Sequence, residues 1–163
     1  MEKYHFTPAN IYNMDETRIS TVEDPGKIIA SKGQKRVGSI TSWERGKNVT
    51  VFCGMSSSGT FIPPTFIFPR KRMSNQLTKN GWTNEEVFLE WLKHFNYHAK
   101  PSQEYSVLLI LDNHNNHISM AAYEFCRSKH IIMLSLPSHT FHRLQPLDVS
   151  FFGPLKTAFK KRV

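Results

Sequence analysis

The segment that most constrains the fold is residues 105–112 (YSVLLILD), in which five consecutive apolar residues, Val107 to Leu111, lead into an aspartate. A continuous apolar run of this kind is typical of a strand at the centre of a sheet that is covered on both faces. Covering both faces requires helices, so the run favours an α/β architecture.

Further strands are expected on either side of this run. Three precede it, at residues 11–17 (IYNMDET), 48–55 (NVTVFCGM) and 60–70 (TFIPPTFIFPR), and one follows it at residues 131–137 (IIMLSLP). The second and third are joined by the turn SSSG and form a hairpin. Pro63 and Pro64 cannot donate to a ladder, so they imply a bulge or an edge position. Residues 31–47 are expected to be loop, with room for a short strand.

Three helices complete the pattern. Asn84 is the expected N-cap of the first, in which Val87, Trp91, Leu92 and Phe95 recur at helical spacing. The second begins at Ser119, and the third covers residues 147–163 with a break near Gly153-Pro154. The order β–β–β–α–β–α–β–α predicts a mixed sheet, with an antiparallel hairpin part, a parallel part and flanking helices.

The length and the net charge of the chain limit the number of domains and the kinds of partner to be expected. A chain of 163 residues suits a single domain. It carries 21 Lys and Arg against 13 Asp and Glu, a net charge of +8, with a pI near 9.6. That balance favours polyanionic partners, although a basic surface that serves only solubility explains it equally well.

Neither the cysteines nor the apolar runs suggest a secreted or membrane protein. Cys53 and Cys126 stand alone in apolar segments, which indicates small core residues in a reducing compartment. No apolar run reaches the roughly 18 residues of a membrane helix, and the first ten residues lack a signal-peptide core. A soluble intracellular protein is therefore expected.

Three aspartates are candidates for a shared metal site. Asp15 is expected at the end of the first strand, Asp112 at the end of the most apolar strand, and Asp148 at the start of the last helix. Ligands of open α/β sheets bind at the carboxyl ends of strands, and clustered carboxylates select Mg²⁺ or Mn²⁺. Each acid also has a simpler interpretation: Asp112 as a turn former or helix cap, Asp148 as a cap, and Asp15 as a solvated strand end whose neighbour Glu16 points to the opposite face.

Histidines and basic runs surround these acids in the sequence. His114 and His117 lack the spacing of a zinc motif, but they could donate hydrogen bonds to phosphate or to the carboxylates. His139, His142 and Arg143 precede Asp148, where a cation could meet a phosphate, and loop solvation is the alternative. Two basic runs are candidate contacts to a nucleic-acid backbone, or otherwise solvated faces; they contain Arg70, Lys71, Arg72, Lys160 and Lys161.

Long stretches of the chain resemble the catalytic domain of pogo/Tigger/Jerky-type DDE transposases. The resemblance runs from about residue 11 to residue 161 and includes YNMDET, GWTNEEVFLEWLKHF, VLLILDNHNNHIS and LPSHTFHRLQPLDVSFFGPLK. It implies a ribonuclease-H-like fold that cuts and joins DNA with Asp15, Asp112 and Asp148 as metal ligands, holding two Mg²⁺ or Mn²⁺ ions. The third acid is Asp, as in the pogo branch. The resemblance also implies a nuclear location and, by family analogy, a homodimer.

The chain departs from the family pattern in three places. Arg18 follows NMDET where the family usually has glycine, and residues 74–80 form a shorter stretch than in relatives. Helix-turn-helix DNA-binding modules normally precede the catalytic domain, and residues 1–163 are expected to hold the catalytic domain alone.

The sequence therefore predicts a transposase-type DNA endonuclease and strand transferase that depends on divalent metal. The alternative is a domesticated or truncated nuclear protein that binds nucleic acid without catalysis. An RNA-cleaving nuclease on the same fold is a third hypothesis, which the motifs do not favour.

Overall fold

The computed structural model describes residues 5–20, 48–68, 84–113, 117, 119–137 and 141–160. The predicted loop at 31–47 lies outside these residues. The strands are β1 (Ile11–Ser20), β2 (Asn48–Ser56), β3 (Phe61–Ile67), β4 (Val107–Leu111) and β5 (Ile131–Ser135). The helices are α1 (Glu85–Ala99), α2 (Met120–Ser128), α3 (Phe141–Leu144), the π-helical turn η2 (Leu147–Phe151) and α4 (Phe152–Lys160).

The strands form one mixed sheet in the order β3-β2-β1-β4-β5. β1, β2 and β3 pair antiparallel, whereas β4 is parallel to β1 and β5 is parallel to β4. The predicted mixed α/β sheet is confirmed. The apolar run is β4, and it is not the central strand: β1 is central, whereas β4 lies next to the edge strand β5. Only alternate residues of β4 are fully buried.

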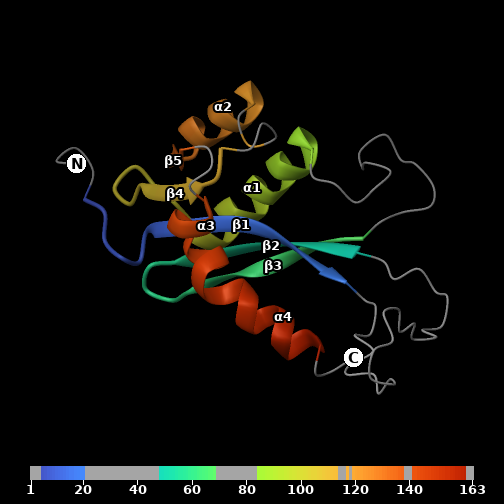
Figure 1. Cartoon of the computed structure of the whole chain (residues 1–163). Coiled ribbons are helices and arrows are strands. Elements are labelled where there is room, and N and C mark those ends of the chain that lie inside the picture. The colour runs from blue at the N-terminus through green and yellow to red at the C-terminus, as the bar shows by residue number, and fades with distance from the viewer. Residues whose placement is uncertain are drawn as a thin grey trace, which may run out of the picture.

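Helices cover both faces of the sheet (Figure 1). α1 and α2 lie on one face, where a core cluster includes Met14, Phe52, Trp91 and Leu109. α4 lies on the other face, where a smaller cluster includes Val51, Leu147 and Phe152. Because strand side chains alternate between faces, Tyr12 and Met14 face α1 while Asn13 and Asp15 face the α4 layer.

The helix caps follow the sequence signals. The side chain of Asn84 accepts a hydrogen bond from Val87 N at 2.9 Å, and that of Ser119 accepts one from Ala122 N at 3.2 Å. The predicted N-cap Asn84 is confirmed, and the second helix begins at Ser119 as predicted, with Ser119 as its N-cap. α1 ends at Lys100, whose φ of 48° is left-handed, and its backbone N–H reaches Asn96 O.

The last helix differs from the prediction of a break near Gly153-Pro154. Helix α4 runs through both residues, and the irregularity is the π-helical turn one step earlier. Pro154 lies three residues after the π turn, inside a continuous helical run, and it removes one backbone N–H donor there. The short helix α3 was not predicted.

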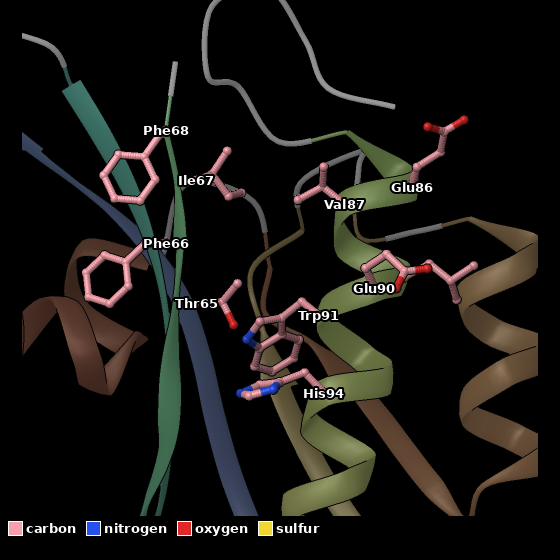
Figure 2. Close-up of a pocket in the computed structure, with 10 residues that line it drawn as sticks. Thr65, Phe66, Ile67, Phe68, Glu86, Val87, Glu90, Trp91 and His94 are labelled. Atoms are coloured by element: carbon pink, nitrogen blue, oxygen red, sulfur yellow. The ribbon is translucent and has the colours of Figure 1, made fainter. Parts of the chain in front are cut away.

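β3 is an edge strand, as its two prolines require, and its register against β2 shifts between Phe52 and Gly54. Between β3 and α1 lies a cavity of about 760 Å³ (Figure 2). Trp91 and His94 of α1 point toward β3 there, whereas Phe66 and Phe68 point away from α1. Among the described residues, none forms a hydrogen bond with the buried indole Nε1 of Trp91.

Candidate active site

The first two aspartates stand on neighbouring parallel strands. β1 pairs with β4 in a register that joins Asn13 to Ile110. Continuing that register by two residues brings Asp15 opposite Asp112, which directly follows β4. The two strands are therefore adjacent, which a site shared by these two acids requires.

Asp15 does not end its strand, so that prediction is wrong. Beyond the part that pairs with β4, β1 continues to Ser20 because it stays paired with β2, and Asp15 itself is in register with Cys53. The consequence is burial: only 8% of Asp15 is exposed. The interpretation of Asp15 as a solvated strand end is excluded.

Asp148 comes from the C-terminal part of the chain, and its charge acts on Asp15. It lies in the first turn of η2, is exposed, and is not the cap, since Pro146 holds that position without a side-chain bond. The interpretation of Asp112 as the cap of α2 is likewise excluded, because Ser119 is that cap. Isolated π turns occur often at functional sites.

The electrostatics of Asp15 connect the three acids. Burial and the nearby charge of Asp148, followed by those of Glu16 and Asp112, raise the pKa of Asp15 to about 8. A backbone bond from Glu16 N to Asp15 Oδ1, at 2.8 Å, acts in the opposite direction but does not cancel the rise. Asp15 is therefore a buried carboxyl group whose ionised form is disfavoured by burial and by the neighbouring acids.

His117 supplies a protein cation next to these acids. Its Nδ1 lies 2.6 Å from Asp112 Oδ1 and its Nε2 lies 3.3 Å from Glu16 Oε1. Burial lowers the pKa of His117, but the bonds to Asp112 and Glu16 outweigh it and raise the pKa to about 9. The ring also packs on Phe88 at a centroid distance of 4.5 Å. The expectation that His117 bonds the carboxylates is confirmed.

Glu16 is a fourth acid of the region that the sequence did not reveal. Its β2 partner is Phe52, so it lies on the α1 face as predicted from strand alternation. The His117 ring nevertheless links Glu16 to Asp112, because one ring nitrogen contacts each carboxylate. No local pattern indicates that contact, because the residues are 101 positions apart.

The donor chemistry of the acids suits a hard divalent cation. Carboxylate oxygens are the ligands that Mg²⁺ and Mn²⁺ prefer, and a cation would relieve the repulsion that raises the pKa of Asp15. Within the described residues, no three His, Cys, Asp or Glu side chains converge as a ready-made ligand set. One oxygen of Asp112 is bonded by His117.

The other predicted contacts are placed only in part. Arg143 in α3 and Lys160 at the end of α4 are exposed, and His142 lies in α3 with its side chain outside the described part. The remaining candidates lie outside the described residues; they are Arg70, Lys71, Arg72, His114, His139 and Lys161. The two cysteines are buried and unpaired, as predicted.

The family follows from a comparison with known proteins. The sequence profile described as DDE superfamily endonuclease matches residues 47–163, or 117 of the 163 residues. The chain belongs to the DDE superfamily endonucleases. The matched region begins just before β2 and includes all later strands and helices of this DDE domain. It contains Asp112 and Asp148, whereas Asp15 precedes it.

Solved structures share the fold of the DDE domain. The Mos1 mariner paired-end complex with Mn matches with a TM-score of 0.68 and 19% identity over 96% of this chain and 44% of that one. The Mos1 strand transfer complex matches with a TM-score of 0.67 and 18% identity over 93% and 41%. The Mos1 catalytic domain with raltegravir and Mg matches with a TM-score of 0.61 and 16% identity over 93% and 62%. The fold is that of ribonuclease-H-like transposase catalytic domains.

One curated relative carries an unrelated name. The MFS-type transporter clz9 of Cochliobolus lunatus is 31% identical over 180 residues, which is 99% of this chain but only 19% of that protein. In the part of the chain that the structure describes, no helix is long and apolar enough to cross a membrane. The chain thus spans about one-fifth of this relative and less than half of the Mos1 chains in the two DNA complexes.

Proposed function

We propose that this DDE domain cleaves and joins DNA strands with a divalent-metal centre held by Asp15, Asp112 and Asp148. The observation that carries the proposal is the buried carboxyl of Asp15, whose pKa is raised to about 8 by burial and by Asp148, Glu16 and Asp112. A buried carboxyl group under repulsion from neighbouring acids reduces stability, and groups with such raised pKa values cluster at functional sites.

The proposed metal is Mg²⁺ or Mn²⁺, with two ions as the expected number. Solved relatives of this fold are described with Mg and with Mn, which supports the choice. A divalent ion at such a site activates a water or 3′-hydroxyl and neutralises charge on the phosphate and leaving oxygen.

The residues of the chain contribute burial, orientation and charge. Asp15 is held rigidly in the middle of β1, and His117 fixes the rotamer of Asp112 through its Nδ1 bond. His117 is fully buried, so this orienting bond is shielded from water. Arg143 and Lys160 are exposed cations that suit contacts to phosphates.

The proposed substrate is DNA, in keeping with the net charge of +8. Contacts made mainly by Lys and Arg to phosphates predict an affinity that falls steeply with salt and discriminates little between sequences. A homodimer and a nuclear location remain proposals that follow from the substrate and the family.

Nicking of supercoiled DNA tests the proposal. We expect the purified 163-residue chain to nick DNA with Mn²⁺ and with Mg²⁺, and to lose this activity with EDTA or in Asp112→Ala. Glu124→Ala is the matched control, because Glu124 is an exposed acid of α2. Equal nicking by wild type and Asp112→Ala, or none by wild type in Mn²⁺, would contradict catalysis and leave DNA binding without cleavage.

A further inference from the structure

Two buried amides, Asn13 and Gln145, form a hydrogen-bonded pair close in sequence to Asp15 and Asp148. Asn13 Nδ2 donates to Gln145 Oε1 at 3.2 Å, and Gln145 Nε2 donates to the backbone oxygen of Met14 at 2.8 Å. Gln145 is completely buried and Asn13 is 5% exposed. Buried amides are costly unless bonded, and this pair joins β1 to a segment 132 residues away.

Asn13 also binds the segments that carry the other two aspartates. Its Nδ2 donates to Ile110 O at 3.1 Å, two residues before Asp112. Its Oδ1 accepts from Leu147 N at 3.1 Å, one residue before Asp148. Asn13 itself lies two residues before Asp15, on the same face of β1. Asn13 therefore belongs to the segment that carries Asp15, and its side chain binds the two segments that carry Asp112 and Asp148.

Gln145 completes the attachment of Asp148. Its backbone oxygen accepts from Val149 N at 3.1 Å. Both neighbours of Asp148 thus donate their N–H groups to the pair, Leu147 to the Asn13 side chain and Val149 to the Gln145 carbonyl. The Val149 bond is an ordinary i→i−4 backbone bond, so the Gln145 side chain acts through its bonds to Asn13 and to the Met14 carbonyl.

We propose that Asn13 and Gln145 are positioning residues, which hold the Asp148 turn and the Asp112 strand end in register with Asp15. Because the pair contacts backbone and not substrate, it acts through the geometry of the acids. The proposal rests on the proposed metal centre for its functional consequence. Groups that orient metal ligands typically change metal affinity 10–100-fold when removed.

Asn10, which directly precedes β1, provides a matched control. Its side chain also joins β1 to the chain next to β4, with Nδ2 donating to Ser106 O at 3.0 Å and Oδ1 accepting from Thr7 N at 2.7 Å. It is 9% exposed. Asn10 lies at the opposite end of β1 from the acids, so its loss should weaken folding without moving them.

The test compares Asn13→Ala and Gln145→Met with Asn10→Ala in the full chain. Mn²⁺ affinity is measured by electron paramagnetic resonance of free Mn²⁺, and hydrogen exchange of the peptide covering residues 145–151 is measured in EDTA. We expect the first two variants to bind Mn²⁺ roughly 10–100-fold more weakly and to exchange faster at Leu147 and Val149. In nicking assays, kcat should fall while KM for DNA stays nearly constant. Asn10→Ala should match wild type in Mn²⁺ affinity.

The outcomes separate this inference from the proposed function. Unchanged Mn²⁺ affinity in Asn13→Ala and Gln145→Met, or an equal loss in Asn10→Ala, would overturn the positioning role. Wild-type protein that binds no Mn²⁺ would overturn the proposed function instead. The hydrogen-exchange data in EDTA would then decide alone whether Asn13 and Gln145 hold the Asp148 turn. Unchanged exchange in the 145–151 peptide would overturn the inference, and faster exchange would support it. If Gln145→Met does not fold, Asn13→Ala still tests the inference, because it removes the bonds to Leu147 N and Ile110 O directly.

Discussion

The Nδ1 atom of His117 lies 2.6 Å from Oδ1 of Asp112, so a buried imidazole occupies a position beside the acids where a metal cation is expected to act. The same ring bonds Glu16 through its other nitrogen. In the metal-free protein, His117 therefore balances part of the acidic charge, while the Asp15 carboxyl group remains under repulsion.

Replacing Asp15 by Asn should stabilise the metal-free protein. The amide keeps the side-chain oxygen that accepts from Glu16 N, but it removes a carboxyl group whose ionisation is disfavoured by burial and by three neighbouring acids. We expect the free energy of unfolding near neutral pH in EDTA to rise by about 1–3 kcal/mol, measured by urea denaturation. Glu90→Gln, at an exposed acid paired with Lys93, should change it little. A less stable Asp15→Asn protein would show that Asp15 is stabilising without metal.

Stability in EDTA should fall as pH rises above about 4. The unfolded chain releases the Asp15 proton near its ordinary pKa of 3.8, whereas the folded chain keeps it up to about 8, so rising pH favours unfolding in that window. His117 acts with the same sign: its charged form contributes fully below 6.5, and the contribution is lost as pH rises through about 9. Urea denaturation across this range checks the slope, which should be shallower between about pH 4 and 8 in Asp15→Asn. A stability that increases with pH there would contradict the pKa directions.

Removing the His117 ring should destabilise the protein strongly. His117→Ala leaves Asp112 and Glu16 without their shared cation and leaves a cavity beside Phe88. The expected loss is about 3 kcal/mol in EDTA. Adding Mg²⁺ should recover part of it, since a metal supplies the missing positive charge. His98→Ala, at an exposed histidine of α1, is the control. A double-mutant cycle with Asp112→Asn that shows no coupling would assign the loss to the cavity alone.

Lys100→Gly should make the protein more stable. Lys100 caps α1 with φ of 48°, a left-handed conformation that costs residues with a Cβ atom roughly 1 kcal/mol and costs glycine nothing. After the entropy that glycine adds to the unfolded chain, a gain of about 0.5 kcal/mol is expected in urea denaturation. Glu104→Gly in the following loop, where φ is not positive, should instead be neutral or destabilising. Equal effects of the two substitutions would contradict strain at Lys100.

Local patterns predicted the regular elements, and contacts between distant segments decided the rest. The apolar run before Asp112 and the caps Asn84 and Ser119 depend on neighbouring residues, so the sequence was sufficient for them. The central position of β1 was not predictable in the same way, because it depends on which strands pair.

The site shows the same division. The three acids could be selected as candidates from family motifs, and Asp112 also from the end of an apolar strand, yet the burial of Asp15 depends on β2 pairing beyond it. The Asn13–Gln145 pair and the His117–Glu16 contact join residues more than 100 positions apart, and no periodicity or spacing indicates them. The π turn that carries Asp148 likewise arises where its backbone is tied to Asn13.

The two prolines of β3 have a consequence for the behaviour of the protein at high concentration. An outermost strand can recruit the same strand of another molecule through its unused N–H and C=O groups, which is how ordered aggregates begin. β3 would be vulnerable, since it is an edge and exposes Phe61 and Phe66. Pro63 and Pro64 lie between these aromatic residues and remove two consecutive N–H donors. Because consecutive N–H groups of a strand point to opposite sides, one of the two prolines removes a donor from the free edge, and we expect this edge to be a poorer template for fibril growth.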